Sequence, residues 1–134
     1  MFSVKKKIYF DQVDPGGIIY FVELFKLLHQ AYEELLESLN TAENYFASEK
    51  YILPIIHSEA DYISPVKLHD EIQINVTVTQ LRESSFELSY NILSSEGNEV
   101  AKGKTVHVAV DRAEFKKVKL QKDLYDGLRK YLKY

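Results

Sequence analysis

One acidic side chain lies in a turn where it could take part in chemistry. Asp14 is followed by Pro-Gly-Gly, and an amphipathic segment begins at Phe21. A carboxylate there neighbours the free backbone N–H groups of a helix start, which favour negative charge. The carboxylate can attack a carbonyl carbon or activate water, while an N–H group polarises the carbonyl oxygen. The sequence therefore offers a candidate site for acyl transfer to water.

A purely structural interpretation of Asp14 stays open. Aspartate before Pro-Gly is common turn chemistry, and it also favours a nearby helix start. The glycine pair, Gly16 and Gly17, favours the catalytic interpretation, because a backbone without side chains lets a ligand approach closely. The run from Ile18 to Phe21 then supplies apolar walls beside the carboxylate.

Periodicity predicts a strand before this turn and a long helix after it. Apolar residues of one parity predict a half-buried strand over residues 2–10, interrupted by Lys6. The helix should run from Phe21 to about Leu39, with its apolar stripe in the core. That stripe recurs every three or four positions and comprises Phe21, Leu24, Phe25, Leu28, Ala31, Tyr32, Leu35, Leu36 and Leu39.

Four strands are expected beyond the helix. Alternation predicts them over about 51–64, 72–79, 86–92 and 100–110, with a short irregular helix over 41–50 and a last short helix over 120–132. Because helices do not alternate with these strands, the sheet should be antiparallel, in an α+β fold. A chain of 134 residues favours a single domain over 1–134.

Composition excludes several classes of function. The net charge is −3, and Lys5–Lys7 is the only basic block, so a nucleic-acid partner is not expected. The absence of cysteine excludes disulfides, thiolate nucleophiles and cysteine-ligated metals. No leader or membrane-spanning run is apparent at the start or elsewhere, so we expect a cytoplasmic protein with no membrane partner.

Histidine and serine patterns do not indicate a metal site or a serine nucleophile. The four histidines lack the spacing of metal ligands, so neither a metal nor another cofactor is expected. The serines at 58, 84 and 85 lie outside any Gly-x-Ser-x-Gly elbow. The four histidines are His29, His57, His69 and His107.

Several segments together resemble hotdog-fold acyl-CoA thioesterases of the 4-hydroxybenzoyl-CoA thioesterase type. They are residues 9–10 with 14–21, residues 53–57 (Leu-Pro-Ile-Ile-His), the turn before Asp70, and residues 85–90. Tyr20-Phe21 with 53–57 is most similar to the 1,4-dihydroxy-2-naphthoyl-CoA hydrolases of quinone biosynthesis. The resemblance covers nearly the whole chain and implies the hotdog fold, a curved antiparallel sheet wrapped around one long central helix.

The resemblance also implies catalytic roles. Asp14 falls on the family's catalytic aspartate, which acts as a nucleophile or as a general base. The Phe21 backbone N–H falls where the thioester carbonyl is polarised. Two departures matter. Gln12 stands where the motif usually has a second aspartate, and Phe21 replaces a His or Tyr of some relatives, which removes a side-chain donor.

Substrate-binding positions follow from the same resemblance. Gly17 and Tyr20 would border the acyl group, with His57 and Ser58 on the strand that follows. For His57, the alternative that stays open is a structural role, as a hydrogen-bonded polar residue on a half-buried strand.

A second group of residues is a candidate for binding CoA. Arg82, Ser84 and Ser85 fall where relatives use basic and small polar residues on the CoA phosphates. Glu83 occupies a place where a second basic residue would help to bind phosphate. The alternative that these residues form only a solvent-exposed turn therefore stays open.

These expectations combine into an acyl-CoA thioesterase that converts an acyl-CoA and water into the acid and CoA. The acyl group should be aromatic, with 1,4-dihydroxy-2-naphthoyl as first choice. A homo-oligomer, dimer or tetramer, is expected because an open sheet leaves an unpaired strand edge. The alternatives are a hotdog dehydratase or hydratase, which would prefer a His/Asp or His/Glu pair, and a non-catalytic acyl-CoA or acyl-carrier-protein binder.

Overall fold

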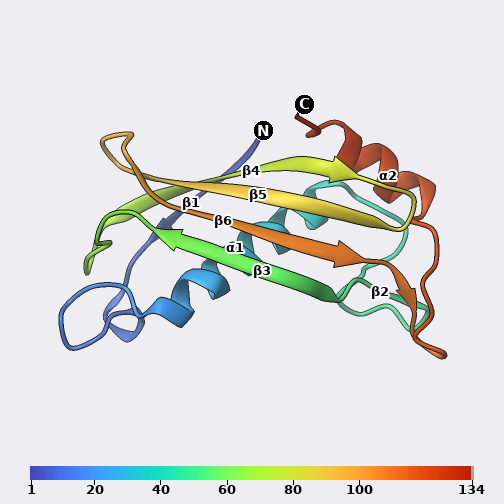
Figure 1. Cartoon of the computed structure of the whole chain (residues 1–134), viewed down its shortest axis with the longest axis horizontal. Helices are drawn as coiled ribbons and strands as arrows, with labels where there is room; N and C mark the ends of the chain where they lie inside the picture. Colours follow the sequence, from blue (N-terminus) through green and yellow to red (C-terminus); the bar gives the residue numbers. More distant parts are fainter. Residues whose placement is uncertain (134) are drawn as a thin grey trace.

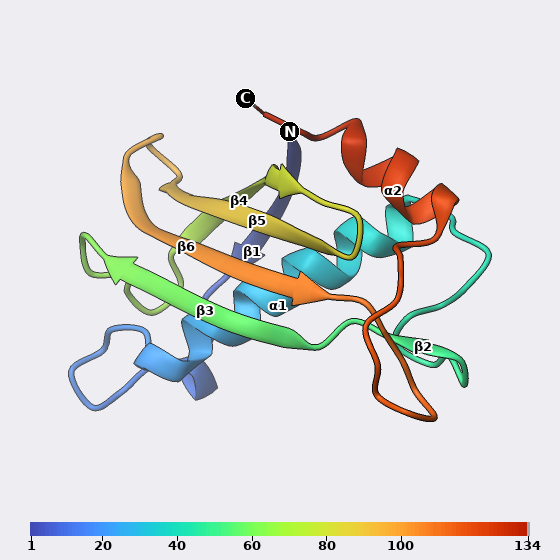
Figure 2. The ribbon, with the colours of Figure 1, turned by 45° about the vertical axis from the view of Figure 1, so that its right-hand side comes forward.

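A long helix lies against a curved five-stranded antiparallel sheet (Figure 1). The computed structural model describes residues 1–133; residue 134, the end of the predicted domain, lies outside the described residues. The sheet order is β1 (Phe2–Lys7), β4 (Glu71–Leu81), β5 (Ser85–Ser94), β6 (Glu99–Val108) and β3 (Ile55–Tyr62). The helix α1 (Phe21–Ser38) runs along the concave face (Figure 2). This is the predicted α+β hotdog arrangement.

The apolar stripe of α1 forms the centre of the core. Its buried residues are Leu24, Leu27, Leu28, Ala31, Tyr32, Leu35 and Leu36. The prediction that the whole stripe is core was wrong at its start, because Phe21 is 59% exposed and Phe25 is only half-buried. The first turn of α1 therefore presents aromatic side chains outside the main core.

Two contacts fix how the sheet meets α1. Lys6, which interrupts the apolar parity of β1, forms an ion pair with Glu34 of the helix at 3.0 Å. Gly103 on β6 lets the backbone come close to the helix, because a Cβ there would lie 2.6 Å from Leu28 Cδ1. One contact comes from the edge strand β1 and the other from β6, so α1 is held at two separate strands of the sheet.

The shorter elements differ from the sequence-based expectations. Residues 41–50 form turns instead of a short helix. The strand expected over 51–64 is divided at Pro54 into β2 (Tyr51–Ile52) and β3, and β2 pairs with β7 (Val110–Asp111) in a separate two-stranded sheet. The first strand ends at Lys7, before a 3-10 turn η1 (Phe10–Gln12). The last helix is α2 (Lys122–Arg129), shorter than predicted.

The strand β3 forms one edge of the five-stranded sheet and pairs only with β6 within the described residues. It is exposed along nearly its whole length. Its last residue, Tyr62, lies at the same end of the sheet as the start of β6 and the end of β5. Within residues 1–133, neither helix has the length and apolarity needed to cross a membrane.

Candidate active site

The loop before α1 holds Asp14 in a fixed orientation. The Gly16 N–H donates to Asp14 Oδ1 at 2.8 Å, and the Gly17 N–H donates to the Asp14 carbonyl at 2.9 Å. Gly17 has φ +78°, a left-handed conformation that favours glycine. The carboxylate is half-buried, and one of its oxygens is fixed by the turn. The other oxygen has no hydrogen-bond partner recorded within residues 1–133.

Neighbouring backbone hydrogen bonds anchor this loop. The Ile19 N–H donates to the Val66 carbonyl at 2.7 Å, and the Tyr20 N–H donates to the Gln12 carbonyl at 2.9 Å. The Gln12 side chain accepts from the Tyr9 N–H at 2.8 Å. Gln12, at the position where the resemblance led us to expect an acidic residue, thus has a structural role in closing the turn.

The start of α1 lies directly after this loop. Tyr20 is the N-cap residue, and its side chain forms no capping hydrogen bond with the described residues. The first N–H groups of a helix have no partner inside the helix, and they carry the positive end of its dipole. The Phe21 N–H belongs to this set, so the helix start can polarise an oxygen placed beside it.

The end of β3 is joined to the same helix turn. The Tyr62 hydroxyl donates to the Phe21 carbonyl. Partial burial raises the pKa of the Tyr62 phenol above its usual value, so the hydroxyl stays protonated and remains a donor. This bond ties the edge strand to the residue whose N–H faces the candidate site.

A mostly apolar cavity of about 300 Å³, which we call the slot, separates α1 from β3. It begins at the second residue of the helix, and residues 22–32 line it over roughly 15 Å, at 1.5 Å per residue. That length suits a flat ring system. The slot is lined by Val22, Phe25, Lys26, His29 and Tyr32 of α1 and by Ile55, Ser58, Tyr90 and Thr105 of the strands.

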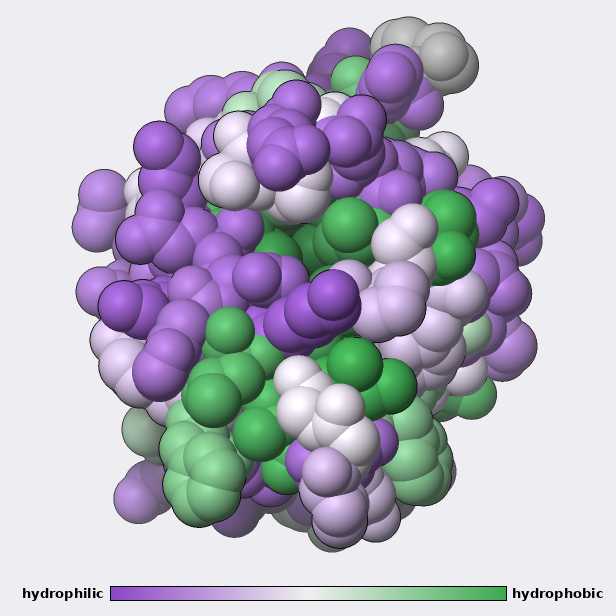
Figure 3. Space-filling view, turned by 90° about the vertical axis from the view of Figure 1, so that its left-hand side faces the viewer, coloured by the Kyte–Doolittle hydropathy of each residue, from purple (hydrophilic) through white to green (hydrophobic). Residues whose placement is uncertain are grey.

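Apolar side chains also gather outside the slot. Figure 3 faces this end of the molecule and shows hydrophobic side chains concentrated on its lower half. Exposed apolar and aromatic residues here come from the loop, the first helix turn and the end of β3: Ile18, Tyr20, Phe21, Val22, Tyr62 and Ile63. The Tyr20 and Phe21 rings lie 5.1 Å apart between centroids. An apolar surface of this kind suits an aromatic or alkyl group, or a second protein surface.

His57 and Ser58 point to opposite faces of β3, as neighbouring strand residues do. Ser58 lines the slot. His57 is exposed, and its Nε2 lies 3.1 Å from Glu59 Oε1. Within one chain, the structure therefore brings Ser58 but not His57 to the slot, and β3 is more exposed than the half-buried strand predicted from sequence.

Arg82, Ser84 and Ser85 lie far from Asp14 within one chain. They occupy the turn between β4 and β5, where the Arg82 N–H donates to the Ser85 carbonyl at 2.8 Å. This turn is at the opposite end of the sheet from the end of β3 and the start of α1 (Figure 1). A single chain does not bring the two groups together.

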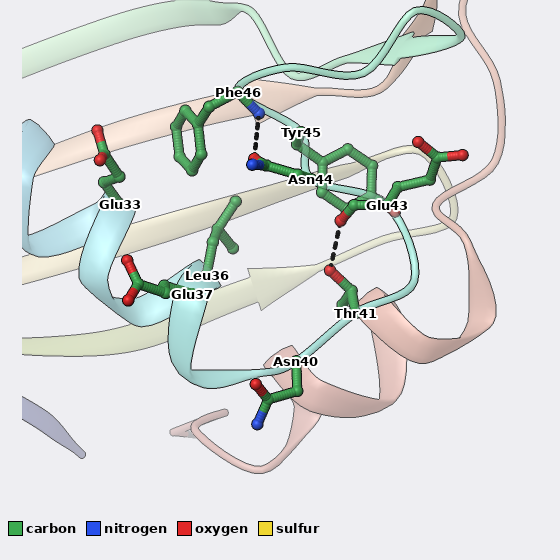
Figure 4. Close-up of a pocket in the computed structure, with 9 residues that line it drawn as sticks. All are labelled: Glu33, Leu36, Glu37, Asn40, Thr41, Glu43, Asn44, Tyr45 and Phe46. Carbon is green, nitrogen blue, oxygen red and sulfur yellow. Dashed lines mark hydrogen bonds between the residues drawn. The ribbon is translucent and has the colours of Figure 1, made fainter.

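Another cavity, of about 330 Å³, lies at the C-terminal end of α1 (Figure 4). Glu33, Glu37 and Glu43 line it, so it repels phosphate groups. The Asn44 side chain there accepts from the Phe46 N–H at 3.0 Å. Among residues 1–133, no three His, Asp or Glu side chains are grouped as metal ligands.

Residues 8–128 match the family described as the thioesterase-like superfamily. The chain belongs to this superfamily. A 1,4-dihydroxy-2-naphthoyl-CoA hydrolase of Crocosphaera subtropica is 32% identical over 112 residues, covering 81% of this chain and 82% of that protein. The hydrolase of the same name from Rippkaea orientalis is 30% identical over 127 residues, covering 92% of each. These relatives confirm the resemblance inferred from the sequence motifs.

A solved structure extends the likeness to three dimensions. A 1,4-dihydroxy-2-naphthoyl-CoA thioesterase from Synechocystis superposes with a TM-score of 0.88 at 27% identity, covering 96% of this chain and 95% of that one. The hotdog fold is therefore shared along nearly the whole length of this thioesterase-like chain.

Several residues of the site were missed by sequence reasoning. Phe25 and His29 were assigned to the helix core or set aside as a non-metal histidine, yet both line the slot. Tyr62, Tyr90 and Thr105 gave no signal, because only strand pairing decides which face of the sheet they occupy. Phe25 is three residues after Val22 and His29 is four residues after Phe25, a spacing that could have indicated a shared helix face.

Proposed function

We propose that this chain is an acyl-CoA thioesterase whose reaction centres on Asp14 and the Phe21 backbone N–H. One observation carries the proposal: a half-buried carboxylate, with one oxygen fixed by Gly16, lies in the loop that leads into a helix start without a side-chain cap, and an apolar slot begins at the second residue of that helix. Membership of the thioesterase-like superfamily supports the same reaction.

In the proposed mechanism, the thioester carbonyl oxygen accepts a hydrogen bond from the Phe21 N–H. As a nucleophile, the free Asp14 oxygen attacks the carbonyl carbon, the C–S bond breaks, and water then hydrolyses the mixed anhydride. As a general base, Asp14 instead takes a proton from water while the water oxygen attacks that carbon; the C–S bond then breaks, and the departing CoA thiolate takes up the proton. Both routes release the acid and CoA without a metal or redox cofactor.

An aromatic acyl group fits the slot best, and the 1,4-dihydroxy-2-naphthoyl group is our first choice. Phe25 and Tyr32 line the slot, and Tyr20 and Phe21 are exposed near its opening. Aromatic side chains beside a planar ring add roughly 0.5–1.5 kcal/mol beyond burial. The names of the relatives support the same acyl group. Gly17 would let the thioester approach the loop closely.

The proposed enzyme works as a homo-oligomer, with β3 of two subunits paired edge to edge. In an antiparallel pair, the start of the partner's β3 lies beside Tyr62. At the start of β3, Ile55 pairs with His107 of β6, which in turn pairs with Phe86 of β5. The β4–β5 turn therefore lies at the same end of the sheet as the start of β3. The partner's Arg82, with its serines, would then approach Asp14 and could bind CoA phosphates. His57, exposed beside this edge, stays a candidate for contact with substrate.

We further propose that residues 1–134 form one domain and that the enzyme acts in the cytoplasm. The described core includes side chains from β1 through α2. The cysteine-free sequence suits a reducing compartment.

A panel of CoA thioesters tests the function. Purified protein is incubated with hydroxyaryl-, aryl- and medium-chain alkyl-CoA, and free thiol is measured over time. Thiol release that is fastest with an aryl thioester supports the proposal. Binding of these thioesters without thiol release would favour a non-catalytic binder, and a faster alkyl substrate would refute the aromatic assignment.

A further inference from the structure

The inner wall of the slot carries a chain of buried polar side chains that the proposed reaction does not use. Tyr90 and Thr105 line the slot, and they are only 1% and 5% exposed. Their hydroxyls lie 2.8 Å apart, and Thr105 Oγ1 lies 2.8 Å from His107 Nε2. Three polar groups are thus linked in a line that leads from the slot into the core.

His107 is the fixed inner end of this chain. Its ring is fully buried and stacks on Phe86, with centroids 4.7 Å apart and planes 6° apart. Tyr32 covers it at 4.2 Å between centroids. Burial lowers the pKa of His107 to about 3, so the imidazole is neutral at physiological pH. The ring can neither swing away nor supply a charge, and it holds Thr105 in place.

At the slot, the hydroxyl of Tyr90 keeps hydrogen-bonding capacity that a ligand can use, whereas His107 Nδ1, which has no hydrogen-bond partner among the described residues, is buried in the core. Thr105 has a single hydroxyl proton, so it can donate to only one of its two partners, Tyr90 and His107. If Tyr90 donates to Thr105, its oxygen lone pairs stay free; if it accepts, its proton stays free. A hydroxyl on a ligand can both donate and accept, so it satisfies Tyr90 in either arrangement.

We propose that the Tyr90 hydroxyl, positioned by Thr105 and His107, recognises a ring hydroxyl of the acyl group and makes the slot specific for hydroxyaryl thioesters. This inference rests on the proposed thioesterase function and names the chemistry of its substrate. An aryl group without a hydroxyl leaves Tyr90 only partly satisfied in an apolar slot. A site built around such a polar group rejects the analogue that lacks its partner.

The test compares a hydroxynaphthoyl-CoA with the matching naphthoyl-CoA, by the ratio of their kcat/KM values. Wild type should prefer the hydroxylated substrate by about tenfold or more, the effect of one neutral hydrogen bond. Tyr90→Phe should bring the ratio close to one, because the hydroxynaphthoyl value falls while the naphthoyl value does not fall. A purely structural role for Tyr90 would instead lower both values together.

Two further variants serve as controls. Tyr45→Phe removes the hydroxyl of another buried tyrosine, which is bonded to Gln121 and does not line the slot, and should keep the preference. Ser58→Ala should also keep it, although Ser58 lines the slot. Loss of the preference in Ser58→Ala but not in Tyr90→Phe would overturn the proposal.

Other outcomes of the same experiment separate the role of Tyr90 from the proposed thioesterase function. A wild type that does not distinguish the two thioesters refutes the inference without any variant, while thiol release from both leaves the thioesterase function intact. If neither thioester is hydrolysed, the proposed function fails instead. If Tyr90→Phe does not fold, Thr105→Val is measured, and an unchanged preference there refutes the role of the chain.

Discussion

At the scale of single residues, the chemistry depends on one carboxylate and its orientation. Asp14 Oδ1 is already engaged by the Gly16 N–H at 2.8 Å, which leaves the second oxygen for the thioester carbon or for water. The amide of asparagine can keep the Gly16 bond, because its carbonyl oxygen accepts as a carboxylate oxygen does. Charge and loop geometry can therefore be separated experimentally.

Asp14→Asn should reduce kcat by several orders of magnitude and leave the fold intact, because it removes the reacting anion and keeps the turn. Thiol release and thermal unfolding measure the two effects. Asp111→Asn is the matched control, because Asp111 also accepts from a backbone N–H, that of Glu114 at 2.7 Å. Near-wild-type turnover in Asp14→Asn would refute the catalytic assignment.

His107 makes stability depend on pH. The pKa of His107 is about 3 in the folded protein and 6.5 in the unfolded chain. The contribution of the neutral ring to the free energy of unfolding is therefore complete above pH 6.5 and is lost as the pH falls toward 3. Lowering the pH from 7 to 5 should cost wild type about 2 kcal/mol through this residue, at 1.36 kcal/mol per pH unit. Urea unfolding of wild type and His107→Gln at both pH values measures the change in the free energy of unfolding. An equal loss of this free energy in the two proteins would contradict the prediction.

At the scale of elements, the site depends on how β3 and α1 are joined. Among residues 1–133, the side-chain hydrogen bond that joins them runs from the Tyr62 hydroxyl to the Phe21 carbonyl. The sheet thereby fixes the helix turn that carries the polarising N–H. Small displacements of such a group are costly, because catalysis needs the donor aimed at the developing oxyanion.

Tyr62→Phe should therefore lower kcat by on the order of tenfold, with little change in KM, because it loosens the helix start without altering the slot. Steady-state kinetics separate the two constants. Tyr125→Phe, in α2 at a distance from the site, should behave like wild type. A Tyr62→Phe variant that raises KM alone would show that Tyr62 binds substrate and does not position the helix.

At the scale of the whole molecule, the exposed edge of β3 is the main unsatisfied feature. Ile55 is 41% exposed and Ile56 is 63% exposed, so apolar side chains accompany the unpaired backbone of this strand. Proteins cover, pair or charge such edges. Pairing with a second subunit would also join Asp14 of one chain with the partner's Arg82.

Ile56→Lys should shift the protein toward monomers and lower its activity, because a charge on the edge strand opposes pairing. Light scattering and thiol release are measured on the same samples. Phe115→Lys is the matched control, since Phe115 is also 63% exposed but lies outside β3. A fully active wild-type monomer at assay concentration would refute the oligomer.

The sequence by itself determined the elements whose signals are local. The Pro-Gly-Gly turn after Asp14, the three-to-four spacing of α1 and the strict alternation from Ile72 to Val78 each reflect backbone geometry within a few residues. The motif at 9–21 also identified the family. Hence the hotdog fold and the location of the candidate carboxylate could be predicted before the structure.

Only the tertiary structure decided which distant residues share the site. The placement of Tyr90 and Thr105 at the slot, and of His57 on the other face, depends on strand register, since a shift of one residue would exchange the two faces. The exposure of β3 depends on its being the last strand of the sheet. Local periodicity carries no information on register or strand order, because both arise from contacts between segments far apart in the chain.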